Sequence, residues 1–240
     1  MKELSLQLYS VKDAFEDTSK VQENFEKIAE MGYTGVEFAG FYGLPKEEMK
    51  KILDRTGLKA VSAHAGDICG KENYYMDYLS YIGAKYIICP WADVDTLDKV
   101  KALAESFNKT GEILSENGFA FGFHDHAHEI TTKYEGVSAW DILFKLTDPK
   151  YVTAQIDTFH VVKAGEDLYQ TIEKYNDRMP TIHLKEITAD KKDMYAGGGI
   201  IDFKKGIDMT NKPNMQYIYE FEGENAMENC EKAAAYLLSL

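Results

Sequence analysis

The chain has 240 residues, 45% hydrophobic and 28% charged, and its 40 acidic against 27 basic residues give a formal net charge of −13. A surface this acidic repels polyphosphate and anionic lipid, which argues against nucleic-acid and membrane partners. Bidentate phosphate clamps are also scarce, because the only arginines are Arg55 and Arg178.

Cysteine usage and the first residues indicate the compartment. Cys69, Cys89 and Cys230 are odd in number and far apart, so they fit neither a disulfide framework nor a CxxC metal site. The start, MKELSLQLYS, alternates instead of forming an apolar signal core, and no apolar run is long enough to cross a membrane. We therefore expect a cytoplasmic location.

The expected elements repeat a pattern of helix, glycine and strand. After a first strand in SLQLYS, amphipathic helices end at four glycines, Gly32, Gly57, Gly83 and Gly118, and the strands VEF, AVSA, YIIC and FAFGF follow them. Such continuous apolar runs are typical of buried parallel strands. The second half is expected to alternate in the same way: WDILFKL (helix), VTAQID (strand), LYQTIEKY (helix), TIHLKE (strand), 202–209 (helix), QYIYEFE (strand) and MENCEKAAAYLLSL (helix).

Eight such units in 240 residues predict a single (β/α)8 TIM barrel domain over residues 1–240. No linker or low-complexity segment marks a domain boundary. A doubly wound open sheet is the structural alternative, because alternation alone does not establish closure. That fold more often carries a glycine fingerprint after its first strand, and QLYSVKD has none.

All six histidines fall at or just beyond the carboxyl ends of expected strands: His64, His124, His126, His128, His160 and His183. In a parallel barrel these ends share the face where active sites form. One histidine at a strand end is more often structural, but six of six indicate a site. Carboxylates join them there: Glu37, Asp157, Glu220 and Glu222. Mixed imidazole and carboxylate ligands predict a site for a divalent transition metal.

Half of the histidines lie in one run, FGFHDHAHEI, at residues 121–130. If this run continues as a strand, alternation places His124, His126 and His128 on one side, with His128 past the rim. Asp125 then faces the helix layer or caps a turn.

Four segments, QIDTFH, TIHLKE, GGGIIDF and YIYEFE, resemble the sugar phosphate isomerase/epimerase family of xylose-isomerase-like TIM barrels. The resemblance covers essentially the whole chain. It implies one divalent ion (Mn, Zn, Co, Fe or Mg) bound by Asp157, His183 and Glu220, and a substrate contact for His160. HDHAHE is similar to a branch whose fifth strand is Tyr-His-Asn-His, where His124 takes the place of a metal-binding glutamate.

That replacement matters for the chemistry. The ketose epimerases of the family move protons with two metal-site glutamates, and this chain keeps one, Glu220. Glu129, expected in the loop beyond His124, is a candidate base, a substrate ligand or a solvated carboxylate. Lys185, on the same side as His183, is expected to stabilise a developing oxyanion. The expected substrate contacts are His64, His126, His160, Glu37 and Trp91.

The expected reaction is proton abstraction next to the carbonyl of a keto-sugar or related polyol, with a metal-stabilised enediolate. A positioned base adds ~10²–10⁴-fold in rate. Return of the proton gives epimerisation or isomerisation, whereas loss of a β-hydroxyl gives dehydration of a cyclitol or keto-acid; these outcomes stay open. Scarce arginine favours an unphosphorylated substrate, although the glycines at 197–199 could cradle a phosphate or form a flexible turn.

Two alternatives come from other classes. Apurinic-site endonucleases share the barrel, but they need a basic groove. A catalytically silent barrel could serve as a subunit or binding module. The sequence leaves open whether the chain forms a homo-oligomer.

Overall fold

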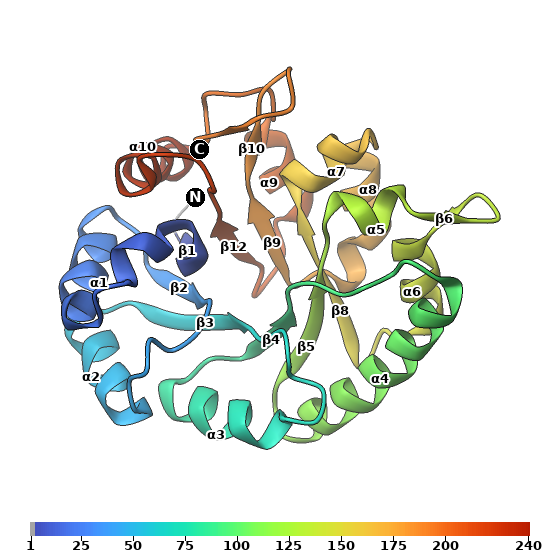
Figure 1. Cartoon of the computed structure of the whole chain (residues 1–240). Coiled ribbons are helices and arrows are strands. Elements are labelled where there is room, and N and C mark those ends of the chain that lie inside the picture. The colour runs from blue at the N-terminus through green and yellow to red at the C-terminus, as the bar shows by residue number, and fades with distance from the viewer. Residues whose placement is uncertain (1–2) are drawn as a thin grey trace.

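The computed structural model describes residues 3–240, and a closed barrel of eight parallel strands forms its centre (Figure 1). In order around the barrel the strands are β1 (Ser5–Gln7), β12 (Gln216–Tyr219), β9 (Thr181–Leu184), β8 (Val152–Asp157), β5 (Ala120–His124), β4 (Tyr86–Cys89), β3 (Lys59–His64) and β2 (Gly35–Phe38). Strand β1 closes the ring because it pairs with both β12 and β2. The predicted barrel is confirmed, and the open doubly wound sheet is excluded.

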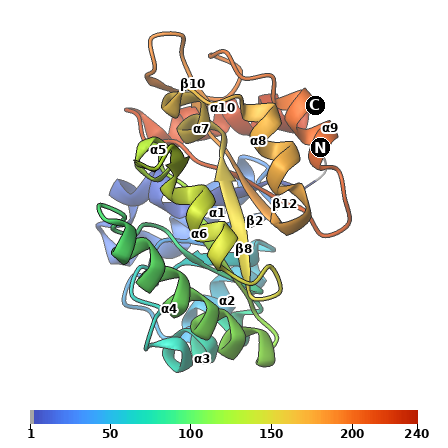
Figure 2. The same cartoon turned by 90° about the vertical axis from the view of Figure 1, so that its right-hand side faces the viewer.

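Eight larger helices surround the strands (Figures 1 and 2): α1 (Val21–Glu30), α2 (Lys46–Thr56), α3 (Glu72–Ile82), α4 (Leu97–Glu116), α6 (Ala139–Leu146), α8 (Leu168–Tyr175), α9 (Phe203–Thr210) and α10 (Ala226–Leu238). The four predicted glycines follow the helix ends with positive φ values, as the pattern predicts: 97° at Gly32, 72° at Gly57, 89° at Gly83 and 81° at Gly118. No helix within residues 3–240 is both long and apolar enough to cross a bilayer.

Shorter elements follow the carboxyl ends of four strands: the 3₁₀ segment η1 (Leu8–Phe15), helices α5 (Ala127–Thr131) and α7 (Thr158–Ala164), and the two-strand ladders β6–β7 (Lys133–Tyr134, Val137–Ser138) and β10–β11 (Glu186–Ile187, Asp193–Met194). Two further 3₁₀ turns are η2 (Thr18–Lys20) and η3 (Asn176–Arg178). The insertions after β1, β5, β8 and β9 therefore surround one end of the barrel.

Alternation along the strands separates an apolar outer layer from a polar interior. In β2, Val36 and Phe38 belong to the hydrophobic core, whereas Glu37 between them is bonded by Gln7 and Gln155 from other strands. All five side chains are fully buried. Because buried polar groups require partners, this network fixes the side chains above it.

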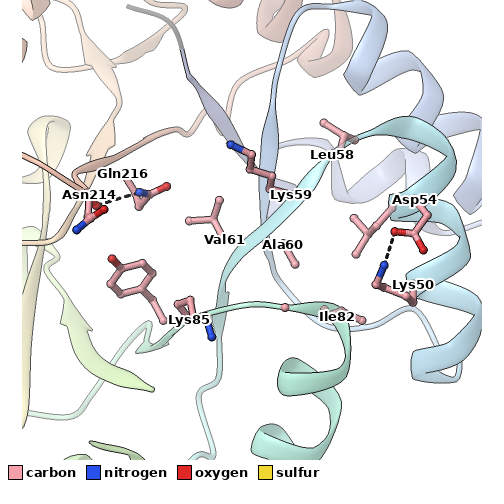
Figure 3. Close-up of a pocket in the computed structure, with 13 residues that line it drawn as sticks. Lys50, Asp54, Leu58, Lys59, Ala60, Val61, Ile82, Lys85, Asn214 and Gln216 are labelled. Carbon is pink, nitrogen blue, oxygen red and sulfur yellow. Dashed lines mark hydrogen bonds and ion pairs between the residues drawn. The ribbon is translucent and has the colours of Figure 1, made fainter. Parts of the chain in front are cut away.

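A cavity of about 490 Å³ lies at the opposite, amino-terminal end of the barrel (Figure 3). Its wall includes Lys59 at the start of β3, Tyr86 at the start of β4 and Gln216 at the start of β12. No histidine is among its 13 lining residues. Active sites of such barrels lie at the carboxyl-terminal face, so this cavity is not the candidate active site.

Candidate metal centre and active site

Four side chains from adjacent strands converge at the carboxyl end of the barrel: His124 on β5, Asp157 on β8, His183 on β9 and Glu220 just after β12. One ligand atom of each lies within 4.8 Å of the others, and all four residues are buried. These are the four ligands predicted from the sequence, and the structure brings them together.

Three facing atoms of this cluster make no hydrogen bond with the described residues, although two of them lie at ion-pair distance. Within residues 3–240, Asp157 Oδ2, His183 Nδ1 and Glu220 Oε2 are buried without a hydrogen bond. His183 Nδ1 lies 2.6 Å from Glu220 Oε2 and 3.9 Å from Asp157 Oδ2, so the atoms are close but not aligned for hydrogen bonding. Buried polar atoms without partners are destabilising unless something binds them. Two imidazoles and two carboxylates form a donor set that suits a divalent transition metal.

Glu37 lies directly beneath His183. Its Oε1 is 2.5 Å from His183 Nε2 and 3.0 Å from His64 Nε2. Burial alone would raise the pKa of Glu37, but His64 and His183 hold it well below its usual range. The ionised carboxylate thereby fixes the ring of His183 with Nδ1 toward the cluster. Glu37 is fully buried and does not line the pocket, so the structure does not bring this predicted substrate contact to the substrate side.

Lys185 points into the barrel, as its alternation with His183 predicts, and is 1% exposed. Its Nζ donates to Glu220 Oε1 at 3.2 Å and also to Glu222. Burial opposes ionisation of Glu220, but Lys185 and His183 lower its pKa well below the usual value. Lys185 therefore acts on the cluster through Glu220, because its amine is held by two carboxylates.

A pocket of about 340 Å³ opens above the cluster. Its wall is formed by Tyr9, Ala39, His64, Pro90, Trp91, His124, His126, Glu220 and Glu222. The predicted contacts His64, His126 and Trp91 thus face one space. His160 does not line it: its ring is 7% exposed and packs behind His126, with the ring centroids 4.5 Å apart.

The expectation that Glu129 lies in a loop is wrong, and so is the strand alternation expected beyond His124. Strand β5 ends at His124, and His126 caps helix α5. Glu129 accepts the backbone N–H of His126 at 2.8 Å, which is half of a capping box. The carboxyl is fully buried, and burial raises its pKa to about 8. Glu129 also lies 3.1 Å from His128 Nε2, and of these two histidines only His126 lines the pocket.

Two residues support the site in ways that the sequence did not predict: Asp125, expected to face the helix layer or to cap a turn, and Gln155. Asp125 accepts the N–H of Asp157 at 2.5 Å and so holds the strand that carries this ligand. Gln155 Oε1 lies within hydrogen-bond distance of His124 Nδ1, at 3.1 Å, and of His64 Nε2, at 2.9 Å. A signal for Gln155 was present, since it stands two residues before Asp157 in VTAQID and shares its face.

The glycine run 197–199 is tied down by Glu186. Glu186 Oε1 accepts the N–H groups of Ile187, Ile200 and Ile201 at 2.9–3.1 Å. Its Oε2 accepts Gly197 N–H at 3.4 Å. Within the run, the Gly197 amide binds Glu186 and the Gly198 amide binds the Tyr195 carbonyl, so a turn is favoured over a phosphate cradle. The run forms a turn, but one fixed by hydrogen bonds.

Both arginines also lie away from the pocket. Arg178 donates to the backbone carbonyls of Phe144 and Val152, where Val152 begins β8. Arg55, in α2, pairs with Glu26 of α1. The described side chains therefore give the pocket no guanidinium.

The chain is similar to one described protein family and to several named enzymes. The family described as Xylose isomerase-like TIM barrel matches residues 25–240. The chain is 29% identical over 199 residues to an inosose dehydratase of Clostridium perfringens strain 13, covering 71% of this chain and 66% of that enzyme. It is 25% identical to the inosose dehydratase of Clostridium beijerinckii, covering 94% and 92% of the two chains.

Among solved structures, a sugar phosphate isomerase/epimerase from Parabacteroides distasonis superposes with a TM-score of 0.82 at 25% identity, covering 98% of this chain and 93% of that one. The family match and the structural superposition both cover nearly the whole chain. The chain belongs to the xylose isomerase-like TIM barrel family.

Proposed function

We propose that this chain is a divalent-metal-dependent enzyme that removes a proton next to the carbonyl of an uncharged polyhydroxy ketone. The observation that carries the proposal is the convergence of His124, Asp157, His183 and Glu220 beneath an open pocket, with three of their facing atoms unpartnered. These residues would hold the ion, which when bound supplies Lewis-acid polarisation of a carbonyl oxygen.

The pocket wall supports an uncharged substrate. Glu220 and Glu222 line it, and a phosphate or carboxylate would be repelled by both. The backbone amides around Gly197 are bonded to Glu186, and neither arginine lies near. A cyclitol or keto-sugar therefore fits better than a sugar phosphate or a keto-acid.

The side chains divide the proton transfers. Glu220 is ionised and lines the pocket, so it takes the proton from the carbon, while Lys185 keeps it charged. Burial lowers the pKa of His126 to about 4, so its ring is neutral and can hold a leaving hydroxyl by an N–H hydrogen bond, while the proton that Glu220 has taken converts that hydroxyl to water. Glu129 contacts His126 and His128 from behind, and its effect on turnover would pass through them.

Dehydration is the outcome that we favour. A proton leaves one carbon, a hydroxyl leaves its neighbour as water, and a double bond forms between them. Two relatives are named inosose dehydratase. Epimerisation or isomerisation is the second candidate, favoured by the similarity to the sugar phosphate isomerase/epimerase of Parabacteroides distasonis. Epimerisation would need a second base, because His124 stands where the ketose epimerases of the family carry a metal-binding glutamate.

Metal analysis followed by incubation with inososes and keto-sugars in D₂O tests the proposal. We expect stoichiometric metal, uptake of deuterium at the carbon next to the carbonyl, and a dehydrated product. Glu220→Gln should lose the exchange by ~10²–10⁴-fold. Glu222→Gln is the matched control, because Glu222 lines the rim but is not in the cluster, and it should keep most of the exchange.

Metal-loaded protein that exchanges no carbon-bound proton in any of these compounds would contradict the enzyme reading. In that case a silent barrel or binding module becomes the better interpretation. A DNA shift that weakens with salt would instead support the endonuclease alternative.

A further inference from the structure

Three histidines meet beside the candidate metal centre: His124 at the end of β5, His126 at the start of α5 and His160 in α7. One ring nitrogen of each lies within 4.8 Å of the other two. The ring centroids are 4.5 Å apart for His126 and His160 and 5.0 Å apart for His124 and His126. No carboxylate belongs to this group of ligand atoms.

The nitrogens of this trio lack partners. Both ring nitrogens of His160 and Nδ1 of His126 are buried and make no hydrogen bond with any group in residues 3–240. His160 is 7% exposed. Leaving a buried donor or acceptor unpaired is destabilising. Three such atoms within one small cluster therefore indicate a bound group.

The tautomer of His124 is set by its neighbour. Its Nδ1 lies 3.1 Å from Gln155 Oε1, an acceptor, so Nδ1 carries the proton and Nε2 keeps the lone pair. Fixing one ring nitrogen in this way prepares the other as a ligand. Since His124 offers one lone pair, it can serve one ion at a time.

We propose that His124, His126 and His160 form a second site for a divalent cation, separate from the carboxylate-containing centre. Three neutral imidazoles suit Zn²⁺ best among the common biological cations, and a fourth position stays open for water or a hydroxyl. When this site is filled, Asp157, His183 and Glu220 remain to bind the other ion. The inference goes beyond the proposed reaction, which requires one ion.

Zinc stoichiometry tests the site without any assay of activity. Protein is dialysed against buffered free Zn²⁺, and metal per chain is measured for the wild type, His126→Ala and His160→Ala. We expect the wild type to bind two ions and each variant one. His160→Gln keeps a polar side chain of similar length and guards against misfolding, and circular dichroism and thermal melting check every variant.

His128→Ala is the matched control, because His128 lies in the same segment but outside the trio. It should keep both ions. If the wild type binds only one ion and His160→Ala still binds it, the second site does not exist. The proposal is also overturned if His128→Ala loses the second ion while His160→Ala keeps it.

Asp157→Asn separates the two proposals. It should remove the ion of the carboxylate-containing centre and leave the trio occupied. If Asp157→Asn keeps both ions while His160→Ala loses one, the trio stands and the carboxylate centre fails. Cobalt provides a second readout, since the visible absorption added by the second equivalent of Co²⁺ should disappear in His126→Ala. An unchanged cobalt spectrum in that variant contradicts the proposal.

Discussion

Glu37 shows how one buried carboxylate can set the geometry of the candidate centre. Its oxygens contact His183 Nε2 at 2.5 Å, Gln155 Nε2 at 2.9 Å and Ser62 Oγ at 2.7 Å. Glu37→Gln keeps the shape but removes the anionic acceptor for His183. We expect metal affinity to fall by about 10–100-fold, the range for lost partners of metal-binding histidines.

Competition with a chromogenic chelator measures this change. Ser62→Ala is the control, because it removes one donor to Glu37 and leaves the charge in place. Its effect on affinity should be much smaller. Equal affinities for Glu37→Gln and the wild type would mean that His183 is oriented by other contacts.

Glu129 makes stability depend on pH in an unusual direction. Burial raises its pKa from the ordinary value of 4.5 to about 8 in the folded chain. Between these values the unfolded carboxyl ionises while the folded one stays protonated, so the unfolded state binds fewer protons. The free energy of unfolding should therefore fall as the pH rises through this window, by about 5 kcal/mol in total.

Urea unfolding at several pH values in the presence of a chelator tests this effect. Glu129→Gln keeps the acceptor for the His126 N–H but cannot ionise, so its stability should vary less between pH 5 and 8. If the variant and the wild type lose stability in parallel over that range, the slope has another source.

At the level of single residues, the position of the candidate metal ligands was predictable, because it needs only a strand end and a residue type. The ligand roles of Asp157, His183 and Glu220 came from the family resemblance, and they stay a prediction. The support from Glu37 was not predictable, because it crosses the barrel to a residue 146 positions away. Glu129 was misplaced because its capping bond to His126 ends the strand pattern early.

At the level of elements, the β10–β11 segment depends on packing around a glycine. A Cβ built on Gly199 would lie 2.5 Å from Glu186 Cδ and even closer to the carbonyl oxygen of Ile187. Gly199→Ala must therefore displace Glu186, whose carboxylate holds the amides of Ile200 and Ile201. We expect a loss of about 1–3 kcal/mol in unfolding free energy, as for overpacked sites.

Thermal melting and amide hydrogen exchange measure the effect. Gly66→Ala is the matched control, since the nearest atom to its added Cβ is 3.8 Å away, in the Pro90 side chain. It should melt like the wild type. Unchanged stability and unchanged exchange at Ile200 in Gly199→Ala would show that the turn yields without loss.

The barrel strands and larger helices were predictable because each carries a periodic pattern or a glycine end. The short elements were not. Helix α5 depends on the His126–Glu129 capping box, and the β10–β11 segment depends on Glu186 binding amides as far away as Ile201. Such bonds join groups whose proximity follows from tertiary structure, so local patterns carry little signal for them.

At the scale of the whole molecule, closure links residues from both ends of the chain. Leu6 of β1 pairs with Tyr219 of β12 on one side and with Val36 of β2 on the other. The interior network joins the same distant segments, since Gln155 of β8 donates to Glu37 of β2. Three candidate metal ligands lie on β8, on β9 and just after β12, whereas His124 on β5 and the carboxylate that orients His183 belong to the earlier strands. The candidate site therefore requires both halves.

This dependence predicts that residues 1–240 unfold as one domain and that neither half folds alone. A division in the exposed turn at 148–150 separates β1–β5 from β8–β12 and leaves two open sheet edges in each fragment. It also uncovers buried side chains along the cut, such as Phe121 of β5 and its register partner Val152 of β8, now at most 1% exposed. Each costs about 1.5–3 kcal/mol to expose, so a few of them exceed a typical stability of 5–15 kcal/mol. Fragments 1–148 and 149–240, expressed separately, should show no cooperative melting by circular dichroism, whereas the intact chain should show coincident fluorescence and circular-dichroism transitions in urea. Cooperative melting of either fragment alone would establish two independent units instead.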